Sequence, residues 1–568
     1  MANNLNARFA MNPNRLLTKR SRFDMPFNHK GTFNTGDLVL FANIEVYPGD
    51  TFSAKETIIL RGSTPIVPVM DNAFLDLYWF FVPYRLVWDD SKAFFGENTE
   101  GPWVDEYEYS VPQVHYQTGE VIPFDSLADD IGLPAGFKNN GEEDISFSAL
   151  PARAYINIWN EWFRDQNLQD PEYFERDSTD SYYVKGSSTG SNVYGTRLKL
   201  CKYHDYFTSA LPQPQKGPAV SIPLSGDIPV FAGEEISLSK VSELNGTHSL
   251  SFAFQSGNVN DWYNSAEEHG VLAVNATKNQ AILGDTQFGT TTTRMTPNNL
   301  YARLSDATSV TINALRQAFA IQALYEIDAR SGTRYRESVK AHFGAIIDDR
   351  TVQVPEYLAG RRIPVHVNQV LQTSSTNEVS PQGNTGAFSL TADSEGVFSK
   401  SFSEHGYLMC VGGVRTVHTY QQGIPVYMQR KRRFDFYYPE LANLGEQPIK
   451  NKTLVLTGSE RDDETFGFNE AWAELRYLPS YVSGSFRNNY SGSLAYWHYA
   501  DYFGDAESNE PQCPYLNFEF IKEVPNNVDR TLAVQSSEHA QWLYDLQIDF
   551  VATRVLPLYS IPGLSRHA

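Results

Sequence analysis

The chain has 568 residues, a formal net charge of −21 and 41% hydrophobic residues, with 32 Tyr and 35 Phe. This apolar and aromatic content supplies a large core and favours strands over helices, so a disordered chain is excluded. The negative charge argues against an outer surface that binds nucleic acid, because such a field repels phosphates unless basic groups are segregated.

Basic and acidic residues are in fact segregated along the chain. The first 30 residues hold six basic residues against one acid, a local charge of +5, whereas residues 97–185 hold 19 acids against five bases, or −14. This polarity is typical of a container for DNA that is basic inside and acidic outside, but a frayed basic terminus on an acidic globule explains it as well. The basic residues of the arm are Arg8, Arg15, Lys19, Arg20, Arg22 and Lys30.

The N-terminus and the cysteines indicate whether the protein is secreted, spans a membrane or carries disulfides. No apolar core of a secretory signal follows Met1, and stretches such as 407–414 fall far short of the roughly 20 apolar residues of a membrane span. Cys201, Cys410 and Cys513 lie more than a hundred residues apart, which indicates neither a disulfide framework nor a zinc site. We therefore expect reduced thiols and no membrane span.

Strand patterns begin after the arm. Apolar residues alternate over 38–46, the turn YPGD follows at 47–50, and alternation continues over 52–60, which predicts two neighbouring strands. A third strand is predicted at 73–81, where both faces are largely apolar, as expected for a strand covered on both sides.

The middle of the chain is less regular. Residues 89–200 are acid-rich and Gly/Ser-rich and are interpreted as long loops, and residues 219–299 carry short alternating runs that indicate a small β-rich insertion. A helix is predicted from near Ser309, with Ile312, Leu315, Phe319 and Ala323 on one stripe, and a second at 334–343.

Strand patterns resume at 361–371, 405–417 and 547–564. Strands at both ends of the chain, with helices and irregular segments between them, predict a mainly β protein, a jelly-roll β-sandwich with long interstrand insertions and a few helices. The segments we expect are a basic arm at 1–30, first strands and acidic loops at 31–218, the insertion at 219–299, and helices with the remaining strands at 300–568.

Catalytic and metal-binding patterns are weak. The GxSxG at 186–190 lacks the preceding strand and following helix of a nucleophile elbow and is interpreted as a loop. The 12 histidines are scattered without ligand spacing, and the acids at 462–464 lack the spacing of a calcium loop and indicate a solvated turn. We predict no catalytic residue, no metal and no cofactor. The 67 acidic residues include many carboxylate pairs, and the sequence does not show whether one has the spacing of a glycosidase pair.

Two segments are candidates for contact with partners. Basic residues run directly into the aromatics of FDFYYP at 434–439, a combination that suits single-stranded nucleic acid, although alternating aromatics are also typical of strand core. The segment 201–217 combines aromatics with prolines that fix an extended backbone, and we expect it to form a strap between subunits. The candidate nucleic-acid residues here are Arg430, Lys431, Arg432 and Arg433, and the candidate subunit contacts are Tyr203, Tyr206, Phe207, Pro212 and Pro214.

Motifs along nearly the whole chain resemble the major capsid proteins of gokushovirus-type Microviridae, small icosahedral single-stranded DNA bacteriophages. Among them are HKGTFNTGDLVLFANIEVYPGDTF at 29–52, CKYHDYFTSALPQPQKG at 201–217 and WHYADYF at 497–503. Further similar stretches lie at 64–88, 301–326, 432–449, 466–477 and 558–564.

The resemblance implies a viral eight-stranded jelly roll and a structural protein without enzymatic activity. It implies self-assembly through pentamers into a T=1 icosahedral shell around circular single-stranded DNA, together with other virion proteins, in the bacterial cytoplasm. It also implies that a variable insertion, here 219–299, projects near the threefold axes and attaches to a host receptor such as a glycan. The alternative from composition alone is a soluble β-sandwich carbohydrate-binding protein or glycosidase.

Overall fold

The computed structural model describes the chain in two compact units. Side chains are described for residues 19–97, 109–141, 143–183, 196–220, 312–373, 382–383, 385–504 and 511–559, and the backbone for short strands between 230 and 302. One unit comprises Met1–Lys216 with Glu326–Ala568, and the other comprises Gly217–Tyr325. Each unit is described by itself.

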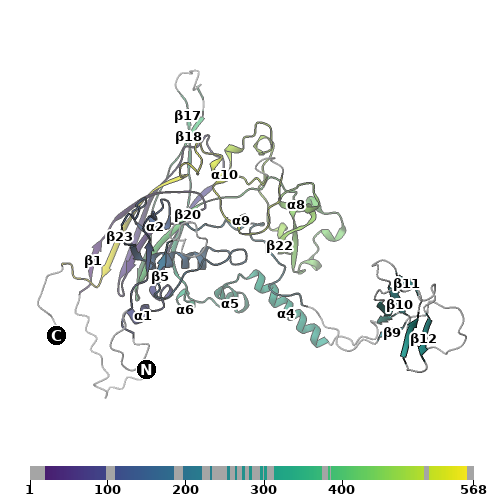
Figure 1. Cartoon of the computed structure of the whole chain (residues 1–568). Coiled ribbons are helices and arrows are strands. Elements are labelled where there is room, and N and C mark those ends of the chain that lie inside the picture. Colours follow the sequence, from purple (N-terminus) through teal and green to yellow (C-terminus); the bar gives the residue numbers. More distant parts are fainter. Residues whose placement is uncertain are drawn as a thin grey trace, which may run out of the picture. The chain divides into compact units, whose positions relative to one another are not determined.

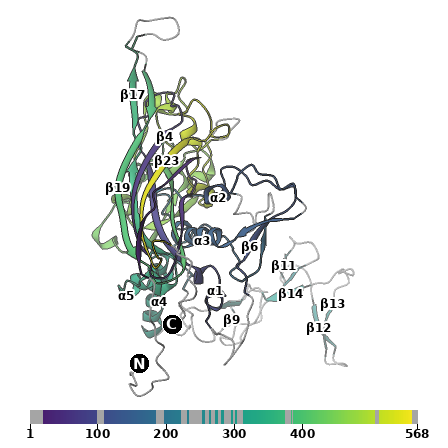
Figure 2. The ribbon, with the colours of Figure 1, turned by 90° about the vertical axis from the view of Figure 1, so that its left-hand side faces the viewer.

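Two antiparallel sheets pack against each other in the first unit (Figures 1 and 2). In the first sheet, β1 and β2 follow one another along the same edge of β23, and β4 and β19 continue the sheet on the other side. Its strands are β1 (Ser21–Asp24), β2 (Phe27–Phe33), β23 (Trp542–Arg554), β4 (Thr51–Gly62) and β19 (Thr391–Ser401). The second sheet has the order β16-β5-β20-β3. Its strands are β16 (Glu356–Pro364), β5 (Ala73–Pro83), β20 (Gly406–Thr416) and β3 (Val39–Val46).

The strand order is that of a jelly roll. With β1 set aside as an extension of β2, each sheet alternates strands from the beginning of the chain with strands from its second half. Every strand pair within these two sheets is antiparallel, and the last strand, β23, lies between strands of the first 62 residues. The predicted fold class is therefore confirmed, including the placing of the first and last strands in one core.

The two strands predicted as neighbours lie in different sheets, so that prediction is wrong. β3 pairs with β20, whereas β4 pairs with β23 and β19. The turn at 47–50 is tight, with Gly49 at a φ of 91° and the Asp50 carboxylate accepting from the Tyr47 amide at 3.0 Å, but it carries the chain across the sandwich. An alternating pattern shows which face of a strand is buried, but it does not show which other strand pairs with it.

The inner faces of the two sheets make one core. Phe52, Ile58 and Leu60 of β4 alternate inward and meet Leu546 and Phe550 of β23. Burial of each such large side chain contributes on the order of 1.5–3 kcal/mol. The strand β5 also has a buried outer face, so the prediction that it is covered on both sides is confirmed.

The segment predicted as long loops covers that outer face with short elements. α3 (Leu150–Ile158) places Tyr155 and Ile156 with Phe80 of β5 and Met409 of β20 in a second buried cluster, and Figure 2 shows α2, α3 and β6 beside the sheets. Part of the apolar surface of this segment is therefore buried inside its own subunit, whereas side chains such as Phe124 and Tyr173 remain exposed. The other elements are η1 (Tyr84–Leu86), α1 (Ser91–Phe94), β6 (Gln113–Tyr116), α2 (Leu127–Ile131), β7 (Ile145–Ser148), the π-helical turn η2 (Trp159–Phe163) and β8 (Ser181–Tyr182).

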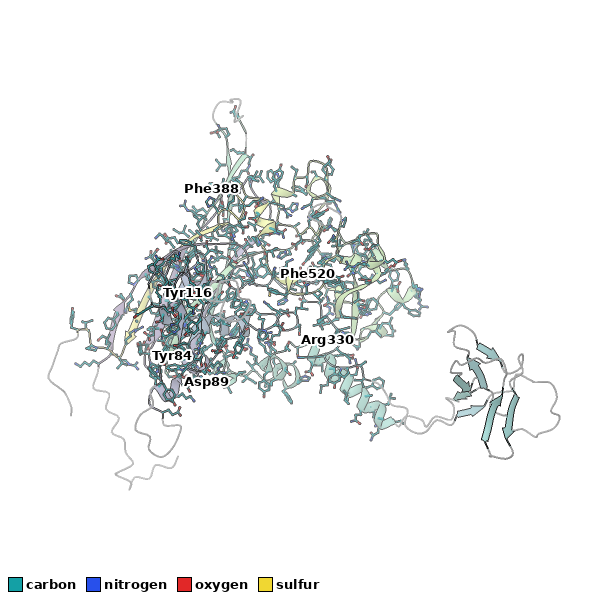
Figure 3. All side chains as sticks on the ribbon, in the orientation of Figure 1. Tyr84, Asp89, Tyr116, Arg330, Phe388 and Phe520 are labelled. Atoms are coloured by element: carbon teal, nitrogen blue, oxygen red, sulfur yellow. The ribbon has the colours of Figure 1, made fainter. Side chains whose placement is uncertain are left out.

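Between β20 and β23 the chain forms a lobe of short elements with a third buried cluster. Phe520, marked in Figure 3, packs there with Phe466, Leu454 and Ile521. The helices and strands are α7 (Val426–Gln429), η5 (Arg433–Asp435), η6 (Pro439–Leu441), β21 (Glu446–Lys450), α8 (Asn451–Leu454), η7 (Glu460–Asp463), β22 (Thr465–Glu470), η8 (Ala473–Leu475), η9 (Gly484–Phe486), η10 (Ala495–Trp497), α9 (Phe518–Ile521) and α10 (Asn526–Asp529).

Both predicted helices are present. They are α4 (Ile312–Arg330) and α5 (Tyr335–Phe343), and the one-turn α6 (Asp349–Val352) follows. The predicted stripe of α4 is not a core face, since Ile312, Leu315 and Phe319 are all exposed in the single chain. A hairpin of β17 (Val367–Leu371) and β18 (Thr385–Ser389) extends beyond the sheets (Figure 1).

The second unit has antiparallel strands in its described backbone. The pairs are β10 with β11 and β14, β12 with β13, and β9 with β15. The boundaries and the role that we predict for the insertion at 219–299 remain predictions. The strands are β9 (Val230–Ala232), β10 (Phe252–Gln255), β11 (Trp262–Asn264), β12 (Val271–Asn275), β13 (Gln280–Gly284), β14 (Arg294–Pro297) and β15 (Leu300–Ala302).

Candidate interfaces for DNA and neighbouring subunits

The segment 201–217 is fastened to the lobe between β20 and β23 of its own subunit. The Lys202 amide donates to the Ile521 carbonyl at 2.8 Å, and Leu211 and Phe468 exchange two backbone hydrogen bonds of 2.8 Å. Lys202 is itself buried. The segment is thus first of all an intrachain strap across the lobe.

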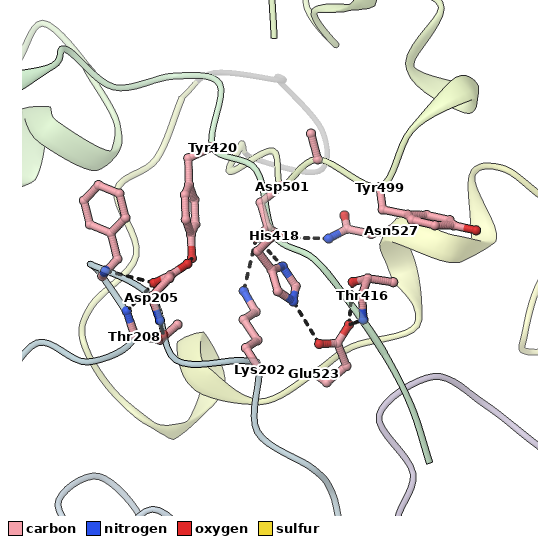
Figure 4. A network of polar contacts seen from close by, with 12 residues as sticks. Lys202, Asp205, Thr208, Thr416, His418, Tyr420, Tyr499, Asp501, Glu523 and Asn527 are labelled. Carbon is pink, nitrogen blue, oxygen red and sulfur yellow. Dashed lines mark hydrogen bonds and ion pairs between the residues drawn. The ribbon is translucent and has the colours of Figure 1, made fainter. Parts of the chain in front are cut away.

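A buried network of charged groups surrounds Lys202 (Figure 4). Both ring nitrogens of His418 face carboxylates, Nδ1 at 2.7 Å from Asp501 Oδ2 and Nε2 at 2.8 Å from Glu523 Oε2. Lys202 Nζ lies 3.4 Å from the same Asp501 oxygen. Asn527 donates to the other Asp501 oxygen at 2.5 Å, and Thr416 Oγ1 donates to Glu523 at 2.8 Å.

Electrostatics keeps this network charged. Burial lowers the pKa of His418, but Asp501 and Glu523 outweigh burial and raise the pKa to about 10, so the ring is an imidazolium that donates from both nitrogens. Burial raises the pKa of Asp501, and His418 with Lys202 outweighs it and holds the pKa well below its usual range. Two cations therefore face two carboxylates away from solvent, which clamps the strap, the end of β20 and the lobe together.

Three of the five predicted subunit contacts pack against their own chain. Tyr203 Oη donates to Asp76 Oδ2 at 2.8 Å, with the Arg362 and Arg415 guanidinium groups 4.2 and 4.1 Å from its ring centre. Tyr206 stacks on Tyr477 with ring centres 5.4 Å apart.

Phe207 is 4% exposed and packs edge-on against Tyr420 in the third cluster. We therefore withdraw Phe207 as a subunit contact, because its own chain already covers it. Pro212 and Pro214 are exposed, and their contact with a neighbour stays a prediction.

The basic arm is described only in part. Arg8 and Arg15 lie outside the described residues, whereas Lys19, Arg20 and Arg22 are exposed at the beginning of β1. Arg22 Nε lies 3.4 Å from Asp24, a pair exposed on both sides, so its charge stays available to a polyanion.

The second basic group, Arg430–Arg433, lies in an exposed turn and not in a strand. The Asp435 carboxylate accepts from the backbone amides of Lys431 at 2.8 Å and Arg432 at 2.7 Å, and these bonds lower its pKa. The turn directs Phe434 outward, where it is 73% exposed. The strand-core interpretation of FDFYYP is therefore wrong. Lys431, Arg432 and Arg433 are exposed, whereas Arg430 pairs with Glu474 at 3.1 Å.

This turn borders an open pocket of about 440 Å³. The opposite wall adds two lysines that sequence reasoning missed, Lys450 and Lys452, whose Nζ atoms lie 2.9 and 2.6 Å from Asp463. The KNK motif at 450–452, with two lysines two residues apart, is the sequence feature that could have identified them. Cations beside flat rings suit a single strand, whose phosphates need charge and whose bases stack. The pocket is lined by the basic Arg430, Lys431, Arg432, Lys450 and Lys452, the aromatic Tyr206, Phe434 and Trp472, and the acidic Asp435, Asp463, Glu470 and Glu474.

Other predicted features bear little on function. Among the described residues, no group of three or more His, Cys, Asp or Glu is placed to hold a metal ion. The GxSxG at 186–190 lies outside the described part of the chain. Asp463 and Glu464 are exposed, as the predicted solvated turn requires. Asp462 is buried and caps the turn by accepting from the Thr457 amide at 2.9 Å and the Gly458 amide at 2.7 Å, so for this residue the prediction is wrong. Cys201, Cys410 and Cys513 are free thiols.

No described helix has the length and apolarity to cross a membrane.

Comparison with known proteins agrees with this fold. Residues 14–564 match the family described as capsid protein (F protein). The chain is 38% identical over 553 residues to capsid protein VP1 of Spiroplasma virus 4, and 37% identical over 548 residues to capsid protein VP1 of Bdellovibrio phage phiMH2K. It is 36% identical over 597 residues to capsid protein VP1 of Chlamydia phage 1. Each match covers 96% of both chains.

These matches confirm the resemblance to microvirus capsid proteins and leave the carbohydrate-binding or glycosidase alternative without support. They span the strands of both sheets, the strap and the lobe, so they concern the whole molecule and not one motif. The chain belongs to the phage capsid protein (F protein) family and is a structural component of a virion.

Proposed function

We propose that copies of this chain assemble, through pentamers, into a T=1 icosahedral shell that encloses circular single-stranded DNA. The observation that carries the proposal is the family match over 14–564 on a chain that folds as a jelly roll. A shell subunit needs self-association and no reaction, so we propose no enzymatic activity and no cofactor. Assembly would take place with other virion proteins in the host cytoplasm.

The DNA side of the shell would carry the two basic groups. Exposed Lys19, Arg20 and Arg22 of the arm and exposed Lys431–Arg433 of the turn support this proposal, because they hold charge that their own chain does not neutralise fully. The pocket beside the turn adds aromatic faces. Acidic surface elsewhere would keep DNA off the outside.

The insertion at 219–299 would project from the outer surface and bind a host receptor such as a glycan. Support comes from its place in the chain, since Gly217–Tyr325 forms a compact unit of its own. Removal of 219–299 should leave particles that form but attach poorly to cells. Loss of all particles would contradict this role.

Electron microscopy and sedimentation of the purified protein test the shell itself. We expect megadalton particles of one size, or pentamers that convert into them. A small oligomer under all conditions, with no particles when DNA is added, would contradict the proposal. Binding of single-stranded DNA to the unassembled subunit should weaken by roughly 0.7 log units per contacted phosphate for each tenfold rise in salt.

A further inference from the structure

We propose that residues 475–483 form a contact with a second copy of this chain. This stretch, LRYLPSYVS, lies on the lobe between β20 and β23 and is called here the bridge. Leu478 is 94% exposed and Tyr481 is 81% exposed, and Leu475 is half exposed. Side chains this open gain nothing from the fold of their own subunit. The inference rests on the proposed shell function.

The bridge is held out from the lobe by fixed ends. At its beginning, buried Trp472 donates from Nε1 to the Leu441 carbonyl at 2.8 Å, and Tyr477 stacks on Tyr206. Beyond its end, Arg487 Nη1 donates to the Gln421 carbonyl at 2.8 Å, and Phe486 packs edge-on against His498. Anchors on both sides present the exposed middle in one place, which lowers the ordering cost of a contact.

The composition of the bridge favours a permanent, apolar interface. No charged residue occurs from 477 to 483, and Pro479 limits the conformations of the middle. Leu475, Leu478 and Tyr481 together expose roughly 400 Å² of side-chain surface, given about 150–250 Å² for a large side chain. The largest apolar patch on a typical monomer is about 300–600 Å² and is often functional, and one side of a standard interface buries about 800 Å².

A groove of about 450 Å³ continues this surface at Leu475. Its lining is mixed, and the Tyr437 and Trp472 rings meet edge-on there at 5.5 Å. The apolar lining residues include Ala442, Ala471, Trp472 and Tyr437, and the polar ones include Glu326, Asn443, Glu470 and Arg476. Arg330, marked in Figure 3, closes one side through its ion pair with Glu446. The groove therefore adds to the surface that the bridge offers to a neighbouring subunit. Members of a shell meet through repeated contacts of this kind.

A second copy fits this face better than a soluble or host partner. Obligate interfaces between identical subunits are more apolar than transient ones, and charged residues are depleted at their centres. The chain belongs to a capsid family, so copies of itself are its most abundant neighbours. Another virion protein at the bridge is the competing outcome.

The first test compares polar and conservative variants in the full chain. Leu478→Ser with Tyr481→Ser should leave the melting temperature of the unassembled subunit unchanged within about 2 °C, because both side chains are in water. The concentration needed for particle formation should rise at least about tenfold. The control, Leu478→Met with Tyr481→Phe, should assemble as the unchanged chain does. Assembly of the serine variant at the unchanged concentration would overturn the inference.

The second test reports directly on the neighbour. In a Leu478→Cys variant, maleimide should label the new thiol rapidly in free subunits and at least about tenfold more slowly in particles. A short cysteine-to-lysine cross-linker at this position should capture peptides of the same chain. Equal labelling in both states, or capture of a different virion protein, would overturn the bridge contact while particles still form. Failure of the unchanged chain to form particles would instead overturn the shell function, and the bridge contact with it.

Discussion

Two charge-rich regions of this subunit differ in what surrounds them. Around His418, two cations and two carboxylates are paired out of contact with water. In the turn at Arg430–Arg433, three of four cations are exposed beside an exposed ring. Buried pairs fix segments of the chain relative to one another, because an unpaired member would be costly. Exposed cations cost the fold little and remain available to a polyanion.

The largest expected effect comes from breaking the buried network. His418→Ala leaves Asp501 and Glu523 without their shared partner, and we expect a loss of about 3–5 kcal/mol in the free energy of unfolding. Urea denaturation of the unassembled subunit measures it. The control His539→Ala removes an exposed histidine and should change the free energy by less than about 0.5 kcal/mol. Equal effects of the two variants would contradict the clamp.

The network should also make stability depend on pH. The folded pKa of His418 is about 10, against an unfolded value near 6.5, so its contribution is complete below pH 6.5 and is lost as pH rises toward 10. The opposite sign holds for Asp501, whose lowered pKa gives a contribution that is lost as pH falls below about 4. We expect a decline of a few kcal/mol between pH 6.5 and 10, and His418→Gln should lack most of it.

The exposed ring of Phe434 tests whether the basic turn binds single-stranded DNA. Phe434→Ala should weaken binding of single-stranded DNA by about 1–3 kcal/mol if one base stacks there. Its effect on unfolding should stay below about 0.5 kcal/mol, because the ring is in water. Fluorescence anisotropy with a labelled oligonucleotide measures binding. Unchanged affinity would show that the ring does not contact bases.

The smallest expected effect is electrostatic. Arg432→Ala with Arg433→Ala should reduce the slope of log affinity against log salt by about 1.4, which corresponds to two phosphate contacts. A matched loss of charge, Lys55→Ala with Arg61→Ala on exposed positions of β4, should leave the slope unchanged. If both double variants lower the slope equally, the salt dependence of DNA affinity reflects only the net charge of the subunit. The turn is then not a specific DNA contact.

Much of the fold could be predicted from local pattern. The strands β5 and β20 and the helices α4 and α5 lie where the apolar periodicity places them. The lobe could not be predicted in this way, because its helices and strands span only three to six residues. Helices and strands this short do not show a recognisable hydrophobic periodicity in the sequence. The burial of Phe466 and Phe520 therefore cannot be predicted from the spacing of apolar residues.

The candidate sites depended on the tertiary structure to a greater degree. Exposed cations at 431–433 were visible as a basic run, whereas Lys450 and Lys452 join them only because β21 and α8 form the facing wall. The His418 network draws on residues from Lys202 to Asn527, and no spacing in the sequence relates them. The sequence positions of the histidines therefore give no sign that His418 lies in a charged network.

The sequence by itself determined the family, the β-rich class and the positions of the main strands and helices, because motifs and periodicity are properties of neighbouring residues. Only the tertiary structure decided that β3 and β4 lie in opposite sheets, that Phe207 is buried and that Phe434 is exposed. An alternating pattern shows that a strand has an apolar face to bury, but the strand or helix that covers this face comes from a distant part of the chain. Which apolar residues stay uncovered, as Leu478 does, is therefore known only after the chain has folded.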